Sequence, residues 1–283
     1  MLHHVGGIDH CVVLVRNLDA AADSYARLGF TVAPRGIHSP QMGTGNHCIM
    51  LRGDYFEMLG VLTPTPANQR WRDVLAHREG MSAVALRAHD AEAGAAEIAA
   101  QGVPTLPVMH FGRPVRMPDG STTETRFHTF HLRDMPIPGL RLFACQHLTP
   151  DATWVPGLMD HANGAEGLAA VEVLAEDSHS AAAVLATLFG RGTETEADGA
   201  LRVPTGAAPL VLLTAAQLAA RYPEMDLSGL AADGPVTMAI RVADLAQTER
   251  VLRSSGVRTL RAASGLAVAP ADAHGVILVF RPG

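Results

Sequence analysis

The stretch Gly7–Val32, GIDHCVVLVRNLDAAADSYARLGFTV, decides the fold because similar stretches begin at Gly80, Gly167 and Gly234. Each copy starts with a glycine, continues as an apolar run typical of a buried strand, passes an Asp that can cap a helix, and ends as an Ala-rich amphipathic segment. In the first, second and fourth copies the first and last glycines are 22 positions apart, and in the third copy the last glycine comes one place later. This spacing indicates an internal repeat.

Short β-like runs follow the helix of each copy, such as residues 48–51 and 55–62 in the first. Each unit therefore reads as βαβββ. One such unit has a one-sided sheet that it cannot bury alone, so we expect the first unit to pair with the second and the third with the fourth. The predicted fold class is α+β, with two domains at 1–150 and 151–283. The turn-rich segment 147–165 is expected to connect them.

Composition excludes several classes of protein. The 283 residues carry a formal charge of −6 with scattered arginines, so we expect no nucleic-acid partner. No apolar run approaches the ~20 residues that cross a bilayer, and the start of the chain lacks signal-peptide features, so we expect a cytoplasmic protein with no membrane partner. The three cysteines have no CxxC spacing and are expected to be reduced. The expected partner is a small molecule, and a homodimer is left open.

Two polar residues interrupt apolar runs, His10 in the first predicted strand and Glu57 in the run 55–62. Alternation along a strand places His10 on the face of Val12 and Glu57 on the face of Leu59. A buried carboxylate without a partner costs several kcal/mol, so Glu57 is expected to have one. We therefore predict that the His10 and Glu57 side chains lie within hydrogen-bonding or shared-ligand distance.

Tandem βαβββ units with His10 on a first strand and Glu57 on a last strand resemble the vicinal oxygen chelate superfamily, which includes glyoxalase I, extradiol dioxygenases and bleomycin-resistance proteins. Residues 37–51, followed by YFEMLGV, are similar to its glyoxalase-like domain. The resemblance implies a U-shaped sheet in which His10 and Glu57 are metal ligands and catalytic residues. Zinc, nickel, manganese or iron(II) would suit them. Because the superfamily contains both enzymes and binding proteins, enzymatic activity stays open.

The second unit lacks the expected partner ligands, because Ala83 stands at the position equivalent to His10 and Phe143 at the position equivalent to Glu57. Two explanations follow. Either the metal has been lost and the protein has no metal cofactor, or ligands are recruited from elsewhere, with His128, His131 and His147 as the candidates.

The second domain is predicted to be degenerate. Ala170 and Thr237 replace the histidine in the third and fourth units, and the matching last strands contain no acid. Its concavity should therefore contain no polar cluster and should be filled by side chains.

Two loops offer further site residues. Gly43-Thr44-Gly45 leads into a strand and not a helix, so it is not a dinucleotide fingerprint. His38 and Asn46 in this loop either contact the substrate or hold the loop in place. The excursion 110–120 carries Arg113 and Arg116. A guanidinium at Arg113 would suit a carboxylate, phosphate or enolate oxygen of a ligand, with a solvated surface arginine as the alternative.

These features predict a glyoxalase-like protein that acts on or binds a small oxygen-bearing metabolite in the concavity of the first domain. If it is a metal-dependent lyase or isomerase, Glu57 would be a ligand and proton shuttle and His10 a ligand. The alternative is a metal-free binding or sequestering protein, which Ala83 and Phe143 favour. A second alternative is an extradiol-type dioxygenase, which requires two histidines and one carboxylate.

Overall fold

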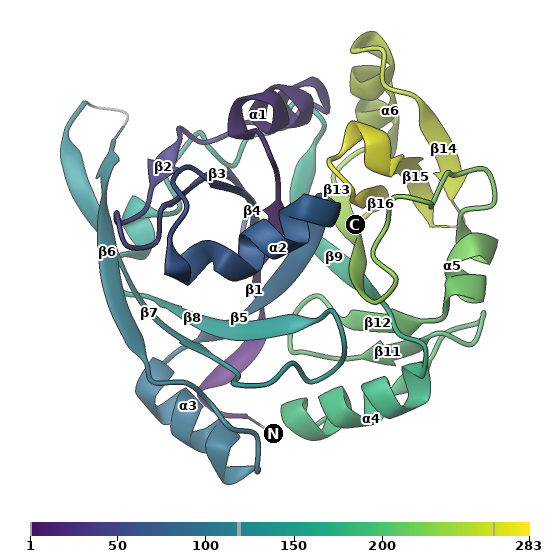
Figure 1. The fold of residues 1–283 in the computed structure, drawn as a ribbon. Helices are drawn as coiled ribbons and strands as arrows, with labels where there is room; N and C mark the ends of the chain where they lie inside the picture. Colours follow the sequence, from purple (N-terminus) through teal and green to yellow (C-terminus); the bar gives the residue numbers. More distant parts are fainter. Residues whose placement is uncertain (1, 118–119, 263) are drawn as a thin grey trace.

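The computed structural model describes residues 2–117, 120–262 and 264–283, and for Arg116 the backbone only. It contains two eight-stranded sheets (Figure 1). The first sheet contains β1 (Val5–Leu14), β2 (Gly36–Ile37), β3 (Thr44–Met50), β4 (Tyr55–Val61), β5 (Gly80–Ala88), β6 (Met109–Arg116), β7 (Thr122–His131) and β8 (Arg141–His147). The second contains β9 (Ala165–Leu174), β10 (Glu194–Thr195), β11 (Leu201–Val203), β12 (Leu210–Leu213), β13 (Gly234–Val242), β14 (Thr259–Ala262), β15 (Gly265–Val268) and β16 (Ile277–Pro282).

The helices come from both halves of the chain. They are α1 (Leu18–Arg27), α2 (Gln69–His77), α3 (Ala91–Ala100), α4 (Ser178–Phe189), α5 (Ala215–Arg221) and α6 (Leu245–Ser254). Asp90, Asp177 and Asp244 cap α3, α4 and α6 through side-chain oxygens, as the repeat predicts. In the first unit the cap is Asn17, not an Asp.

Strand pairing follows the same plan in both sheets. The first runs β2-β3-β4-β1-β5-β8-β7-β6 and the second β10-β11-β12-β9-β13-β16-β15-β14. The first strand of each unit pairs in parallel with the last strand of that unit, and in antiparallel fashion with the first strand of the partner unit. The prediction of an α+β fold with four βαβββ units in two pairs is confirmed.

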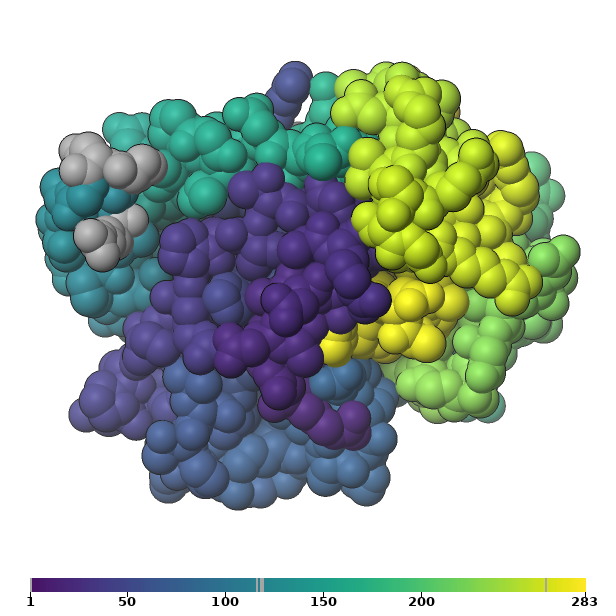
Figure 2. Space-filling view, turned by 90° about the horizontal axis from the view of Figure 1, so that it is seen from above, coloured from purple at the N-terminus to yellow at the C-terminus, as the bar shows by residue number. Residues whose placement is uncertain are grey.

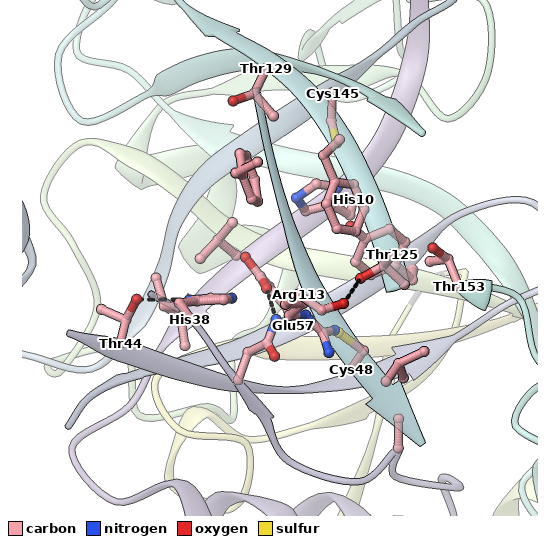
Figure 3. A pocket seen from close by; sticks show the side chains of 18 of the residues that line it. His10, His38, Thr44, Cys48, Glu57, Arg113, Thr125, Thr129, Cys145 and Thr153 are labelled. Carbon is pink, nitrogen blue, oxygen red and sulfur yellow. Dashed lines mark hydrogen bonds between the residues drawn. The ribbon is translucent and has the colours of Figure 1, made fainter. Parts of the chain in front are cut away.

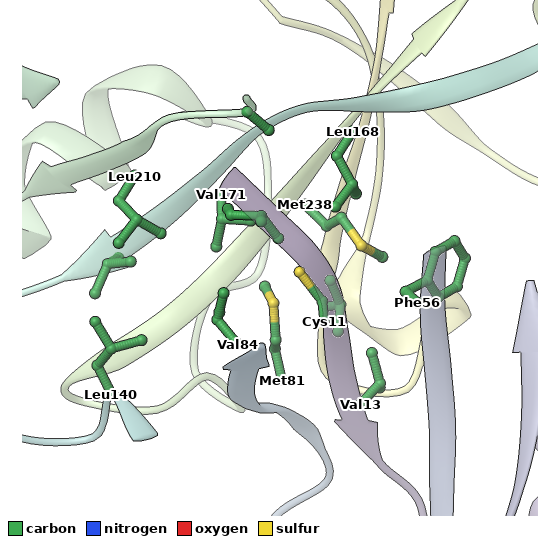
Figure 4. Packing of buried hydrophobic residues seen from close by; sticks show 14 of the residues in the cluster. Cys11, Val13, Phe56, Met81, Val84, Leu140, Leu168, Val171, Leu210 and Met238 are labelled. Atoms are coloured by element: carbon green, nitrogen blue, oxygen red, sulfur yellow. The ribbon is translucent and has the colours of Figure 1, made fainter. Parts of the chain in front are cut away.

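One face of each sheet is buried in a shared core. Cys11 and Val84 of the first sheet and Val171 and Met238 of the second belong to one cluster of buried side chains (Figure 4). The opposite faces of the sheets, which carry His10 in the first, are therefore left to form the two concavities.

The two ends of the chain also meet. Figure 2 shows the surface of the first unit, in purple, against the last residues of the chain, in yellow. The Tyr25 hydroxyl of α1 donates a hydrogen bond of 3.2 Å to the carbonyl of Ala273. Phe30 and Phe280 stack with ring centroids 5.9 Å apart. These contacts tie the fourth unit to the first.

The first sheet curls until its edge strands β2 and β6 contact each other (Figure 1). Helix α2, which the sequence analysis did not anticipate, covers part of the concave face. Its Trp71 and Val74 pack with Val12 and Leu59 of the sheet. The rest of the concave face is left open as a cavity.

In the second sheet the corresponding helix fills the concavity, as predicted. Leu218 on α5, and Tyr222 and Met225 beyond its end, pack among the side chains of the concave face. The prediction that no polar cluster lies there is wrong, because Glu172 is fully buried on that face. Its carboxylate accepts hydrogen bonds from Arg221 (2.7 Å), the Tyr222 hydroxyl (3.0 Å) and Arg281 (3.2 Å).

The segment 148–164 between the sheets packs tightly. The Trp154 indole donates a hydrogen bond of 3.1 Å to the carbonyl of Leu51. His161 donates from Nε2 to the carbonyl of Met50 at 2.8 Å, and its Nδ1 accepts from the amide of Thr31 at 3.0 Å. The segment is thus a wall of the first half, and a domain boundary at 150 stays a prediction. Among the described residues, no helix is long and apolar enough to cross a membrane.

We expect Phe280→Ala to destabilise the protein by about 3–5 kcal/mol, because Phe280 is fully buried where the two ends of the chain meet. Chemical denaturation would measure this loss. The control is Val184→Ala, at a side chain that is 45% exposed, which should change the free energy of unfolding by less than about 0.5 kcal/mol. Equal effects of the two substitutions would contradict a core shared between the two ends.

Candidate functional site

A cavity of about 620 Å³ lies in the concavity of the first sheet (Figure 3). Strands β1, β3, β4, β6, β7 and β8, helix α2 and the segment 148–164 all contribute to its wall. Six of the residues singled out from the sequence line it: His10, His38, Asn46, Glu57, Arg113 and His131. His128 and His147 lie outside its lining, and the side chain of Arg116 lies outside the described residues.

Glu57 and its neighbours form one polar group on the wall. Asn46 Nδ2 donates a hydrogen bond of 2.5 Å to Glu57 Oε2, so the expected partner of Glu57 is Asn46. A Cβ at Gly36 would lie 2.8 Å from Arg113 Cζ and 2.4 Å from Asn46 Oδ1. The absence of a side chain at Gly36 therefore lets this amide and the guanidinium come close together.

His38 faces the same group. Its Nδ1 lies 2.8 Å from Thr44 Oγ1. Burial lowers the pKa of His38; the charge of Glu57 opposes this shift and that of Arg113 adds to it. His38 therefore presents a neutral imidazole at neutral pH, together with the carboxylate of Glu57 and the cation of Arg113.

His10 is held by Asp9, a residue that the sequence analysis missed. Asp9 is fully buried, and its Oδ1 lies 2.7 Å from His10 Nδ1 and 3.0 Å from His147 Nε2. Arg87 Nε lies 3.4 Å from Asp9 Oδ2. Burial alone would raise the pKa of Asp9, but the hydrogen bonds and charges of the two histidines outweigh it and hold the pKa well below its usual range.

A β-bulge explains why alternation did not reveal Asp9. In the pairing of β1 with β5, Ile8 lies opposite Leu86 and His10 opposite Ala85, so Asp9 is the extra residue. An extra residue re-aims side chains locally, and here it brings the Asp9 carboxylate beside the His10 ring. The sequence signal was an acid directly adjacent to a buried histidine.

His10 and Glu57 both line the cavity, but each has a different partner. In the ladder, His10 lies opposite Tyr55 and Val12 opposite Glu57. No hydrogen bond or ion pair joins His10 to Glu57 among the described residues, so the predicted direct contact is absent. A shared ligand between them stays a prediction.

The sequence matches the family described as "Glyoxalase-like domain" over residues 8–189. The chain belongs to this family. A comparison with curated proteins found no match. The fold of this glyoxalase-like protein is similar to that of three solved structures, all below 20% identity, so the likeness concerns the fold.

The first is a hypothetical protein from Staphylococcus aureus, with a TM-score of 0.68, 11% identity, and coverage of 98% of this chain and 99% of that one. The second is a mutant of 4-hydroxymandelate synthase from Streptomyces coelicolor, with a TM-score of 0.58, 14% identity, and coverage of 92% and 77%. The third is a xylose isomerase-like TIM barrel/4-hydroxyphenylpyruvate dioxygenase fusion protein, with a TM-score of 0.55, 17% identity, and coverage of 92% and 40%. Together with the family match, they place the glyoxalase-like protein in the vicinal oxygen chelate superfamily.

The ligand set that this superfamily implies does not fit these residues. Strand register confirms that Ala83 and Phe143 occupy the positions equivalent to His10 and Glu57. Val12, two positions after His10, lies opposite Glu57, and Ala85, two positions after Ala83, lies opposite Phe143. The Phe143 ring centroid is 5.3 Å from that of His10, on the side where a second-unit ligand would stand. His10 and Glu57 are thus without second-unit ligands at these positions.

A different donor set exists at Asp9, His10 and His147, whose ligand atoms all lie within 4.8 Å of one another. Two imidazole nitrogens and one carboxylate oxygen suit a divalent ion such as zinc or iron(II). His147, one of the recruitment candidates, thus lies beside His10, but Glu57 does not belong to this group, and ligation by His147 stays a prediction. His131 is not part of this group: its ring stacks on Phe143, and its Nδ1 is buried without a hydrogen-bond partner.

We expect the stability of the parent protein to fall between pH 7 and pH 5 more than that of His131→Asn. Burial, with Arg70 and Arg141, lowers the pKa of His131 to about 4. Between pH 6.5 and 4 His131 is therefore protonated in the unfolded chain but neutral in the folded chain, so acid lowers the free energy of unfolding. The contribution at pH 5 is up to about 2 kcal/mol.

Chemical denaturation of both proteins at pH 7 and pH 5 would measure this difference. The asparagine variant controls for every other titrating group. A stability difference between parent and variant that does not change with pH would contradict a neutral, buried His131.

Proposed function

We propose that this glyoxalase-like protein binds a small oxygen-bearing metabolite in the cavity of the first sheet and transfers a proton on it. One observation carries the proposal: a mainly apolar cavity of about 620 Å³ whose lining includes the polar side chains of His10, Glu57 and Arg113. Cavities of roughly 300–1,000 Å³ are the usual size for small-molecule sites. His10, Glu57 and Arg113 offer a base, a carboxylate and a cation to one ligand.

His10 is the proposed base. Its Nδ1 is occupied by Asp9, and no protein group among the described residues hydrogen-bonds its Nε2. A carboxylate that holds one ring nitrogen fixes the orientation and tautomer of the ring and stabilises its protonated form. Nε2 of His10 is then suited to accept a proton from a carbon or hydroxyl of the ligand, with Arg113 near the oxygen on which negative charge develops.

A panel of α-hydroxy ketones, α-hydroxy acids and α-keto acids, screened by thermal unfolding, tests this binding. A compound present at 100 times its Kd should stabilise the parent by about 2.7 kcal/mol. We expect His10→Gln to remove or weaken the shift, because the amide keeps a polar group but loses the base. The control is His110→Gln, at an exposed histidine outside the cavity lining.

Two results would contradict the proposal. In the first, no compound of the panel stabilises the parent. In the second, His10→Gln and His110→Gln bind the same compounds equally well, which would place binding outside this cavity.

A second candidate function, a metal-dependent one, is favoured by the group of Asp9, His10 and His147. These three side chains would hold the ion, which would supply a Lewis acid beside the cavity. The same contacts also give Asp9 hydrogen-bond partners without an ion, with Arg87 as a further cation. Metal uptake separates the two cases.

The test compares Asp9→Asn, His147→Gln and Glu57→Gln by elemental analysis of protein purified without chelators or a histidine tag. If the group at Asp9 binds the ion, Asp9→Asn and His147→Gln lose it and Glu57→Gln keeps it, because only the first two remove a ligand. Loss in Glu57→Gln alone would place the ion at Glu57. No uptake of zinc, nickel, manganese or iron(II) by the parent would exclude the metal-dependent function. Circular dichroism checks that each variant is folded, since Asp9 is a buried charge.

A further inference from the structure

Two arginines meet at the α2 side of the cavity without a carboxylate. Arg70 Cζ lies 4.6 Å from the centre of the Trp71 ring, and Arg141 Cζ lies 5.9 Å from the centre of the same ring. Among the described residues, neither guanidinium makes a hydrogen bond or an ion pair with a protein group. Arg70 is exposed yet lines the cavity, so its guanidinium stands where the cavity meets solvent. Arg141 is half-buried and lies outside the cavity lining, next to the same Trp71 ring.

The electrostatic surroundings of this pair are positive. Burial lowers the pKa of Arg70, and the charge of Arg141 lowers it further. Burial is also the main cause of the low pKa of His131, which lines the cavity, and the charges of both arginines add to it. No acidic residue contributes to the shifts of Arg70, Arg141 or His131. Holding like charges together without a counter-charge costs energy, which a bound anion would offset.

Arg113, the arginine that the sequence singled out, has different surroundings. Burial is the main cause of the pKa shifts of His38 and Cys48. The charge of Glu57 raises both pKa values, and the charge of Arg113 lowers both. Arg113 thus has a carboxylate of the protein in its surroundings, although no ion pair joins Arg113 to Glu57 among the described residues. Around Arg70 and Arg141, by contrast, only positive charges act on the neighbouring groups.

We propose that Arg70 and Arg141 form a subsite for the oxyanion of the ligand, a carboxylate or a phosphate group. Two guanidinium groups offer several N–H donors to the oxygens of such a group. The rings of Trp71 and Phe143 provide apolar surface beside it. The ligand would then be an organic acid or phosphate ester with its anionic end at α2 and its reacting end at His10. This inference rests on the proposed function, because it assumes that the ligand occupies the same cavity.

The position of the two tryptophans provides the experiment. The chain contains only Trp71 and Trp154, so Trp154→Phe leaves Trp71 as the single fluorescent reporter, next to both arginines. In this background, inorganic phosphate and acetate are titrated separately at constant ionic strength. We expect a saturable change in Trp71 fluorescence with at least one of them. Saturation by phosphate alone would indicate a phosphate ester, and saturation by acetate a carboxylic acid.

Arg70→Gln and Arg141→Gln should each weaken this binding about tenfold or more, since each removes charge-assisted hydrogen bonds. Arg72→Gln is the matched control: Arg72 also lies on α2, but its guanidinium bonds to Asn68 and to Gln69. Three results would overturn the subsite: no saturable change with either anion, unchanged affinity in both variants, or an equal loss in Arg72→Gln.

The outcome is independent of the test of the proposed function. Anion binding that depends on Arg70 and Arg141, without any stabilising compound in the metabolite panel, would support the subsite and reject the proposed metabolites. A panel compound whose binding depends on His10 but is unchanged in Arg70→Gln and Arg141→Gln would support the proposed function and reject the subsite.

Discussion

The antiparallel pairing of β1 with β5, and of β9 with β13, is the constraint on which the rest of the structure depends. A βαβββ unit alone has an apolar sheet with nothing to cover it, and this pairing joins two such units into one curved surface. The curvature creates a concave face, and the opposite faces of the two sheets pack into one core. His10 lies on β1 at the centre of the first sheet, so its environment is set by residues from both units.

The repeat could be predicted because it rests on spacing and on apolar periodicity, which packing against a common core imposes. Ala83 and Phe143 could be assigned to their positions for the same reason, since register carries over from unit to unit. Asp9 could not, because strict alternation would point it away from His10 and only the β-bulge brings the two together. The partner of Glu57 could not be predicted from a local pattern either, because Asn46 lies on a neighbouring strand.

The two halves show how one architecture gives two different interiors. In the second sheet the concave face holds Glu172, and α5 brings Arg221 and Tyr222 to its carboxylate. Charge and volume are both satisfied there by the chain itself. In the first sheet α2 covers only part of the concave face. Arg70 and Arg141 form no ion pair with any of the residues that the structure describes. The sequence could not show this difference, because it depends on how far a short helix extends over the sheet.

The segment 148–164 limits where the coding sequence could be divided between the two halves. It links the two sheets, yet Ala152, Val155 and Leu158 are part of the cavity wall of the first half. The repeating unit and the set of residues that line the cavity therefore have different ends. A recombination event that exchanged the second half at residue 150 would replace one side of the cavity together with it.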